Sequence, residues 1–427
     1  MNDSLAGKRL LVLGSTPDEI PLIKRAQQLG VYAIVTDYNT DYSLSPAKMV
    51  ADEAWDISWS DVDALAERCA MRGVDGVTAG FSEIRIENLI KLCGKLGLPC
   101  YANEGQLAIT RDKVLFKEEC RKHGVPTIKE YDGVDSVESY PVIVKPVDRA
   151  GSIGVGIAHD RGELERAFAV ATEKSLCGKV IIEDYVTDSV EMDAHYAICD
   201  GEVTLLATDD IIPAARNASE GKVVQSAWLY PSRYEGSFLE AVDPALRRMI
   251  EAMGIRDGTI FFSGFANDAG RFAFFECGFR LWGEQEFAYD LRTRGINYLD
   301  IYIHHALTGS SKSVERRGKI EPDLKGAALN LYVQGGAISE VEGFDEIAKE
   351  RDCVLCIDSA RVGQECPSDG AILVKAGLVG FASESPLVLM ECVEKAYGAI
   401  HIKNEEGADM LYDRVSADEV GLWWGEA

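Results

Sequence analysis

The sequence predicts an α/β protein built from several domains, and three observations support this class. Short apolar runs alternate with helical patterns through residues 1–105, which is typical of a doubly wound parallel sheet. Residues 106–312 mix strands and helices around a glycine-rich loop, and residues 320–427 read mainly as short strands and turns. A chain of 427 residues is long enough for about two to four domains.

Composition excludes several classes of partner. The chain has 44 Lys and Arg against 70 Asp and Glu, a net charge of −26, which disfavours nonspecific binding to nucleic acid or to an anionic membrane. We expect neither a membrane span nor a signal segment, because no apolar run is long enough and the residues after Met1 lack the basic-then-apolar pattern. The eleven cysteines are scattered, so we expect reduced thiols and a cytoplasmic protein. Cys353 and Cys356 have CxxC spacing but are interpreted as packing residues of a strand.

The first 105 residues are predicted to form the parallel sheet. Gly14 and Asp37 leave open a nicotinamide-cofactor half, but one glycine is a poor match to that fingerprint, so a structural sheet is the favoured interpretation. The predicted elements are strands at 9–14, 31–36 and 76–80, a fourth strand entered at 97–100, and helices at 18–29, 60–72 and 84–96.

The stretch 140–156 carries the clearest chemical signal. Residues 142–144 are apolar and β-branched, which predicts a buried strand, and Lys145 ends that strand. A lysine at this position is costly unless it meets an anion. Backbone N–H groups of a glycine-rich loop can close on phosphate oxygens, and such a loop follows with Gly151, Ser152, Gly154 and Gly156. A plain hairpin with a glycine turn is the competing interpretation.

The remaining elements follow from periodicity. Alternation over residues 190–198 places Glu191, Asp193 and His195 on one face of a strand. The polar residues 213–225 are interpreted as a mobile loop and 309–319 as a linker. The other predicted helices are 113–123, 162–174, 243–253, 296–307 and 385–397, and the other predicted strands are 179–186, 203–208, 259–267, 272–276, 327–333, 335–341, 354–357, 371–379 and 399–402.

The order and spacing of the chemical features resembles the ATP-grasp superfamily, nearest to its biotin carboxylase and carbamoyl-phosphate synthase branch and the related amino-acid ligases. The features are Lys113, Lys145 with its glycine loop, residues 183–186, Glu191, and Glu276 with Arg280. The resemblance covers nearly the whole chain. It implies a pre-ATP-grasp domain (1–105), a two-lobed α+β ATP-grasp domain (106–312) with a mobile lid lobe at about 125–190, and a C-terminal domain (320–427) like that of biotin carboxylase. Related folds often dimerise, so a homodimer is a further expectation.

The resemblance also implies a role for each matching residue. Glu276 would hold Mg²⁺ on the phosphates of ATP, and Arg280 would steady an acyl phosphate or its carboxylate. The implied nucleotide ligands are Lys113 and Lys145 for the phosphates, Gly151, Ser152 and Gly154 for the lid, Glu183, Tyr185 and Val186 for the adenine, and Glu191 for the ribose.

The implied chemistry suits these residue types. A carboxylate is a poor electrophile until ATP converts it to an acyl phosphate, which an amine then attacks. Phosphoryl transfer needs alignment and charge neutralisation more than a protein nucleophile, and a lid excludes water from the intermediate. We therefore expect an ADP-forming carboxylate–amine ligase that acts on a small carboxylate such as an amino acid or a peptide.

The sequence departs from the family pattern at the metal site. Gly278 stands where the family usually has asparagine, and the preceding strand offers Ser263 where a carboxylate or an amide is usual. Glu284 and Glu286 are possible helpers, and an asparagine at 278 is expected to strengthen metal binding if the backbone permits it. Because this site has fewer metal ligands than the family pattern, a non-catalytic or regulatory ATP-binding protein remains an alternative.

The substrates stay open. Carbamoyl-phosphate or carboxylase chemistry is a third reading, although the chain lacks a biotin-attachment motif. Specificity is assigned to the loops at 209–225 and 282–294. Arg216, Arg292 and Arg294 are candidates for a substrate carboxylate, although each taken singly is better interpreted as a surface charge.

Overall fold

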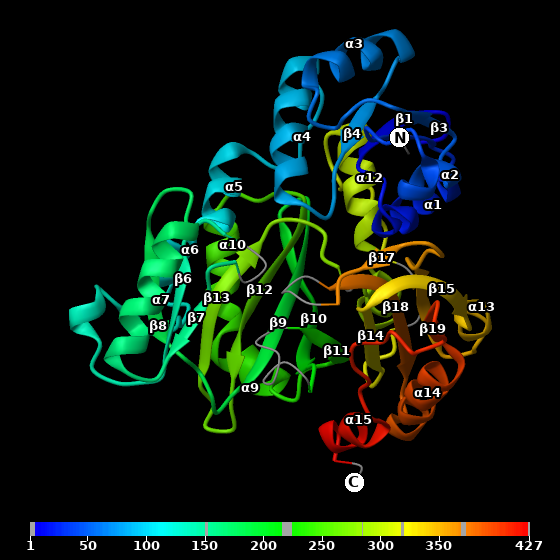
Figure 1. Cartoon of the computed structure of the whole chain (residues 1–427). Coiled ribbons are helices and arrows are strands. Elements are labelled where there is room, and N and C mark those ends of the chain that lie inside the picture. The colour runs from blue at the N-terminus through cyan, green and yellow to red at the C-terminus, as the bar shows by residue number, and fades with distance from the viewer. Residues whose placement is uncertain are drawn as a thin grey trace.

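The computed structural model describes residues 5–149, 153–215, 224–283, 285–316, 320–368 and 373–425, in which the strands form four sheets. Figure 1 shows the N-terminal parallel sheet at one end, a small sheet lobe at one side, and a large central sheet that continues into the C-terminal region. The mixed α/β class predicted from the sequence is confirmed. Among the helices of the described ranges, none has both the length and the apolar character that crossing a bilayer requires.

The N-terminal sheet has four parallel strands in the order β3-β2-β1-β4. The fourth strand predicted at 97–100 is wrong: this segment contains Pro99, which cannot donate to a ladder, and it leads into a helix capped by Asn103. The missing strand is the short β3, whose sequence EAW alternates too briefly to be read as a strand. The elements are β1 (Arg9–Leu13), β2 (Tyr32–Thr36), β3 (Glu53–Trp55), β4 (Gly76–Thr78), α1 (Ile20–Gln28), α2 (Ala47–Val50), α3 (Val62–Arg72) and α4 (Glu83–Leu96).

The small lobe is a four-stranded antiparallel sheet, β5-β8-β6-β7, covered by α7. Leu164 and Ala171 of α7 pack on Val142 and Val144, as the apolar strand predicts. Helix α6 begins after Asp112, whose carboxylate accepts a hydrogen bond from the Val114 N–H. The elements are α5 (Glu104–Arg111), α6 (Lys113–His123), β5 (Glu130–Tyr131), β6 (Val142–Pro146), β7 (Gly156–Ala158), α7 (Arg161–Lys174) and β8 (Val180–Asp184).

The large sheet has eight antiparallel strands in the order β13-β12-β9-β10-β11-β14-β18-β16. It passes without a break through the predicted domain boundary at 312–320, because β11 pairs with β14 over four residues on each strand. Its strands are β9 (Val190–Cys199), β10 (Glu202–Pro213), β11 (Gln225–Tyr230), β12 (Gly258–Ala266), β13 (Phe272–Gly278), β14 (Lys325–Val333), β16 (Cys353–Asp358) and β18 (Val374–Ser383), accompanied by α9 (Glu235–Ala241), α10 (Asp243–Ala252), α11 (Phe287–Arg294) and α12 (Tyr298–Thr308).

The C-terminal region adds a small sheet, β17-β15-β19, beside the end of the large one. Its core is formed by Val393 and Ala396 of α14 packed with apolar side chains of β14, β15 and β18. The elements are β15 (Gly336–Glu342), α13 (Phe344–Ile347), β17 (Glu365–Cys366), α14 (Pro386–Ala399), β19 (His401–Asn404) and α15 (Ala417–Trp423).

Candidate functional site

Lys145 lies at the end of a buried strand, as the sequence predicts. It belongs to β6, and its Nζ atom is 2.5 Å from Oε2 of Glu183 on the neighbouring β8. Glu183 has no exposed surface, so it sits in a low-dielectric setting where its charge must be matched. The pair therefore fixes a cation at the floor of the small lobe, where an anionic ligand would meet it.

A second buried lysine, Lys117, completes this group. Its Nζ atom contacts the other carboxylate oxygen of Glu183 and lies 3.0 Å from Oε1 of Glu130. Lys113, one helical turn earlier on α6, donates to the carbonyl oxygen of Arg149 at 3.2 Å. Sequence reasoning selected Lys113 and missed Lys117, although the i, i+4 spacing places both on one helix face. Three lysines thus converge beside the predicted phosphate loop.

The pH dependence of ATP binding follows from this clustering. Burial, together with repulsion from Lys117 and Lys113, lowers the pKa of Lys145 to about 7, against the attraction of Glu276 and Glu130. Bound phosphate favours the charged lysine, so ATP binding takes up a proton when the free lysine is neutral. Affinity should therefore fall as pH rises above about 7, by up to about tenfold per pH unit.

Calorimetric titration of ATP in buffers of different ionisation enthalpy measures this proton uptake. The control is Lys145→Arg, because a guanidinium stays charged over this range. A parent protein with the same pH profile as Lys145→Arg would contradict the assignment.

The hinge after β8 is open to solvent, in contrast to Glu183. Tyr185 is exposed, and its backbone N–H donates to Pro141 O at 3.1 Å, while Val186 is half-buried. Glu183 is already held by two lysines, so its predicted hydrogen bond to adenine stays a prediction. The predicted adenine role of Tyr185 and Val186 also stays a prediction, because the Tyr185 N–H is already bonded within the small lobe.

The glycine loop is anchored at its described ends. Gly151 and Ser152 lie outside the described residues. Gly154 has φ +77°, and an added Cβ would lie 2.8 Å from the Cβ of Lys174, so both backbone and space require glycine there. On the other side, Arg149 Nε donates to Lys174 O at 2.7 Å. Both ends of the loop therefore rest on the end of α7.

The loop at 148–156 is expected to open readily in the absence of nucleotide and to become protected when ATP and Mg²⁺ are added. Ile153 and Val155 are exposed, so little apolar burial holds the segment between its anchors. Amide hydrogen exchange with and without MgATP measures this, with the paired strands β15 and β19 of the C-terminal region as an internal control. Unchanged exchange at 148–156 would count against a lid.

Glu276 stands in a row of polar side chains that crosses the large sheet. It is exposed on β13, directly opposite Ser263 of β12, which in turn lies opposite Asp193 of β9. A bulge between Ser263 and Gly264 adds a residue to β13 at this point, and Lys145 Nζ lies 5.5 Å from the ring of Phe275. Glu276 and Lys145, the predicted metal and phosphate ligands, are thus neighbours in space, although 131 positions separate them in the sequence.

Glu191 faces Glu276. Burial and the negative charge of Glu276 raise the pKa of Glu191 to about 7, and Gln225 Nε2 donates to its Oε1 atom at 3.0 Å. The predicted ribose role of Glu191 stays a prediction. Its position also gives a bound cation a second carboxylate within reach of Glu276, which the sequence pattern did not reveal.

Gly278 is enclosed by an aromatic ring. An added Cβ would lie 2.4 Å from Cε1 of Phe261, which is buried. The expectation that asparagine at 278 strengthens metal binding is therefore wrong on steric grounds. Gly278→Asn should instead destabilise the protein by about 1–3 kcal/mol, the usual cost of overpacking.

Urea unfolding of Gly278→Asn and of the double variant with Phe261→Leu tests this reading. The smaller leucine should recover part of the loss, because it vacates the space that the new side chain needs. Parental stability of Gly278→Asn with tighter Mg²⁺ binding would contradict it.

Arg280 is held by the N-terminal domain. Its Nε atom is 2.5 Å from Oε1 of Glu83 at the start of α4, and its guanidinium lies 4.9 Å from the centre of the Phe261 ring. In this structure Arg280 therefore forms its ion pair with Glu83 of the N-terminal domain. Its predicted role toward an acyl phosphate stays a prediction, and Glu83 is a positioning partner that sequence reasoning missed.

The other candidate arginines are engaged in the structure. Arg292 forms a bidentate pair with Glu321, at 3.0 and 2.8 Å, and Arg294 donates to the carbonyl oxygens of Leu205 and Leu206. Interpreted from the sequence as surface charges, both are partly buried in the structure and bonded to other parts of the chain. Arg216 and Glu284 lie outside the described residues. Glu286, the other proposed metal helper, is buried and accepts a hydrogen bond from the Trp282 indole.

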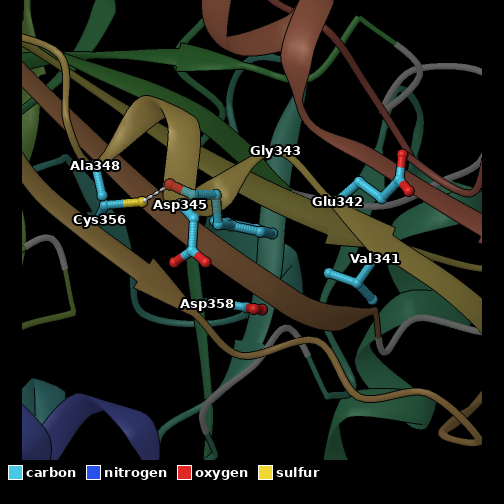
Figure 2. Close-up of a pocket in the computed structure, with 8 residues that line it drawn as sticks. Val341, Glu342, Gly343, Asp345, Ala348, Cys356 and Asp358 are labelled. Atoms are coloured by element: carbon cyan, nitrogen blue, oxygen red, sulfur yellow. Dashed lines mark hydrogen bonds between the residues drawn. The ribbon is translucent and has the colours of Figure 1, made fainter.

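A separate hollow of about 250 Å³ lies in the C-terminal region, and Figure 2 shows it. The residues that line it come from β15, α13 and β16 and include none of the predicted site residues. Asp345 and Asp358 both line it, and burial together with the charge of Asp345 raises the pKa of Asp358. The hollow is therefore acidic and unsuited to phosphate.

Comparisons with known proteins agree with this geometry. A family model described as the D-ala D-ala ligase C-terminus matches residues 107–220. The chain is 36% identical over 104 residues to a D-alanine–D-alanine ligase from Fusobacterium nucleatum, covering 24% of this chain and 33% of that protein. It is 28% identical over 149 residues to a carbamoyl phosphate synthase large-chain section from Methanopyrus kandleri, covering 34% of this chain and 26% of the relative. The chain thus spans a third or less of these curated relatives.

Solved structures match over nearly the full length. The L-amino acid ligase from Bacillus licheniformis has a TM-score of 0.74 at 19% identity, covering 94% of this chain and 99% of that one. The biotin carboxylase domain of the Hydrogenobacter thermophilus 2-oxoglutarate carboxylase, solved with MgADP and bicarbonate, has a TM-score of 0.76 at 17% identity, covering 93% and 90%. The chain therefore has the fold of the ATP-grasp enzymes, and the resemblance read from its sequence is confirmed. Within that class, its neighbours include both amino-acid ligases and biotin carboxylases.

Proposed function

We propose that this chain is an ATP-dependent, ADP-forming ligase that joins a small carboxylate, such as an amino acid or a peptide, to an amine. The observation that carries the proposal is the convergence of Lys113, Lys117 and Lys145 with the exposed carboxylate of Glu276 at the junction of the small lobe and the large sheet. Cations for phosphate and a carboxylate for a metal ion are what phosphoryl transfer from MgATP requires. The ligases among the relatives support the same reading.

The residues present fit a magnesium ion. Glu276 is exposed at the strand, Glu191 lies close enough for its pKa to respond to Glu276, and Ser263 contributes a hydroxyl opposite Glu276. These are hard oxygen donors, which Mg²⁺ prefers, and the ion usually keeps waters and takes phosphate oxygens as well. When bound, Mg²⁺ would neutralise charge on the transferring phosphate.

The protein's own groups divide the remaining work. Lys145 and Lys113 would neutralise phosphate oxygens, and the pair with Glu183 would keep Lys145 in place. Arg280, held by Glu83, would stabilise the carboxylate that accepts the phosphoryl group. The loop at 148–156 would exclude water from the acyl phosphate. All eleven cysteines are free thiols, which supports a cytoplasmic setting.

The test is ADP release across pairs of amino acids supplied with MgATP. A ligase releases ADP fastest when acid and amine are both present, and a new amide product accompanies it in equal amount. Background release that no pair of substrates increases would remove the ligase proposal.

A regulatory ATP-binding protein is the second candidate, and Ser263 is the observation that favours it. The position opposite Glu276 carries a hydroxyl and no carboxylate, which leaves the ion with fewer charged ligands. Tight binding of ATP without ADP release under any substrate pair would support this candidate. Carboxyphosphate chemistry would instead show as bicarbonate-dependent ADP release, as the carboxylase and carbamoyl phosphate synthase relatives suggest.

A further inference from the structure

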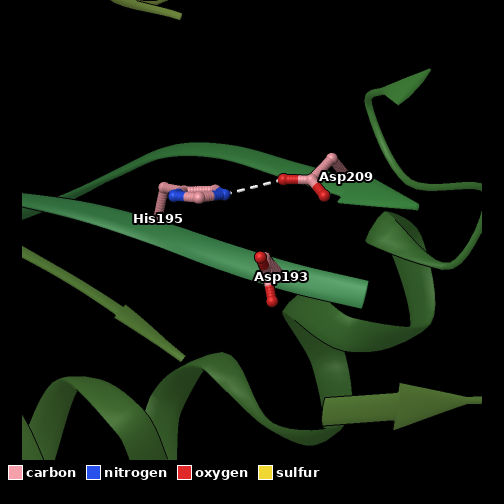
Figure 3. A group of neighbouring side chains, drawn as sticks. All are labelled: Asp193, His195 and Asp209. Carbon is pink, nitrogen blue, oxygen red and sulfur yellow. Dashed lines mark hydrogen bonds and ion pairs between the residues drawn. The ribbon is translucent and has the colours of Figure 1, made fainter. Parts of the chain in front are cut away.

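A second group of possible metal ligands lies on the large sheet, apart from Glu276. Asp193 and His195 are two positions apart on β9, so they share a face, and Asp209 lies opposite Asp193 on β10. Figure 3 shows the three side chains together, with His195 Nε2 2.7 Å from Asp209 Oδ2. One ligand atom from each lies within 4.8 Å of the others, and all three residues are buried.

The imidazole is also held from its other side. His195 Nδ1 lies 3.6 Å from Oε1 of Glu286, whose other oxygen accepts a hydrogen bond from the Trp282 indole. The Trp282 ring packs on His195 with centroids 4.4 Å apart. Glu286 is 5% exposed, and its Oε1 atom has no hydrogen-bond partner among the described residues. This oxygen is therefore buried, and its contact at 3.6 Å is with the side of the imidazole opposite Asp209.

This arrangement is the one that metal-binding histidines use. A carboxylate behind the ring accepts a hydrogen bond from the N–H of one nitrogen, which leaves the lone pair of the other nitrogen directed at the ion. Here Glu286 stands behind Nδ1, Nε2 points toward Asp209, and Asp193 lies within the same cluster. Ligand atoms around a divalent ion with bonds of about 2.0–2.2 Å lie roughly 3 Å apart, so the three ligand atoms, now within 4.8 Å of one another, must move closer together when the ion binds.

We propose that Asp193, His195 and Asp209 bind a divalent transition-metal ion of the Zn²⁺ or Mn²⁺ class, with Glu286 as the residue that orients His195. One imidazole nitrogen and two carboxylates select such ions over Mg²⁺, which prefers oxygen alone. The site lies in the same row of side chains as Ser263 and Glu276, but its ligands are buried and need no phosphate. It therefore binds its ion without nucleotide, in contrast to the Mg²⁺ proposed at Glu276.

The chain contains a matched control for this site. His305 Nδ1 lies 2.8 Å from Asp257 Oδ2, which gives a second histidine–aspartate pair, with a half-buried histidine and a buried aspartate. That pair belongs to no cluster of three or more possible metal ligands among the described residues. His305→Gln thus removes a comparable imidazole without touching the proposed ligands.

The experiment is titration of the metal-stripped, nucleotide-free full chain with Co²⁺, followed by visible absorption and equilibrium dialysis. We expect one equivalent bound with bands of nitrogen and oxygen ligands. His195→Gln should weaken binding at least tenfold, and Glu286→Gln should weaken it about 10- to 100-fold, as loss of an orienting carboxylate usually does. His305→Gln and Glu276→Gln should bind Co²⁺ as the parent does.

Three outcomes overturn the proposal. They are a parent chain that binds no Co²⁺, binding with the charge-transfer bands of thiolate ligands, and parental affinity in both His195→Gln and Glu286→Gln. The titration of the parent chain tests the proposed metal site even if one variant fails to fold. The titration contains no nucleotide, so it tests the metal site separately from the ligase proposal. A chain that binds one Co²⁺ here but has no ligase activity would contradict only the ligase proposal. A chain that is an active ligase but binds no Co²⁺ would contradict only the metal-site proposal.

Discussion

Replacing Glu276 by glutamine is expected to reduce phosphoryl transfer by at least about 100-fold, the usual cost of removing a group that stabilises developing charge. An amide lacks the charge to hold Mg²⁺ on the phosphates. Ser263, directly opposite, offers only a hydroxyl, so no equivalent ligand stands in the adjacent strand. Adenine recognition at residues 183–186 should persist, because that hinge belongs to the small lobe. The free protein should bind Mg²⁺ only weakly, since the phosphates supply part of the coordination.

Calorimetric titration of ATP with and without Mg²⁺, beside an ADP-release assay, measures both effects. Glu365→Gln is the matched control, because Glu365 is an exposed strand glutamate on β17, outside the site. Magnesium should tighten ATP binding in the parent and in Glu365→Gln but not in Glu276→Gln. If Glu276→Gln releases ADP at the parental rate, Glu276 has no part in the mechanism. That result would favour a regulatory ATP-binding protein over a ligase.

Replacing Lys145 by alanine is expected to weaken ATP binding by about 1.5–3 kcal/mol, the usual range for a charge-assisted hydrogen bond. This corresponds to roughly 10- to 150-fold in affinity. The fold should survive, because Lys117 still contacts the buried Glu183 after Lys145 is removed. Lys117→Met should lower the free energy of unfolding more than it weakens ATP binding, since Lys117 is more deeply buried than Lys145.

Fluorescent-nucleotide binding and urea unfolding of both variants separate these profiles. Lys179→Ala is the control, because Lys179 is an exposed lysine at the start of the neighbouring strand β8. Lys145→Ala that binds ATP as tightly as the parent would show that this lysine does not face phosphate.

Much of the fold could be predicted because its elements are locally marked. The apolar run before Lys145 and the glycine that ends α6 both act within a few residues. The strand expected at 97–100 failed because proline breaks a ladder, and β3 was missed because three residues give no period to read. The continuity of the large sheet could not be predicted, since the pairing of β11 with β14 joins residues almost a hundred positions apart.

The residues of the candidate site also fall into two groups, those with a local sequence signal and those without one. Lys113, Lys145 and Glu276 stand at positions whose spacing carries the family pattern, and the structure brings Lys145 and Glu276 near each other. Lys117, Glu83 and the facing of Glu191 toward Glu276 depend on how separate elements pack, and no local pattern signals them. The lack of space for a side chain at Gly278 could not be predicted either, because Phe261 lies 17 positions earlier on another strand.

The uninterrupted eight-stranded sheet limits how this molecule can be divided. Excising everything after residue 320 would remove β14, leave β11 paired only with β10, and open a row of backbone N–H and C=O groups along an edge. Such edges recruit strands from other molecules, so the shortened chain should aggregate where the full chain stays dispersed. The C-terminal region therefore supplies the strand that covers this edge of the large sheet, whereas the small lobe has a separate sheet of its own.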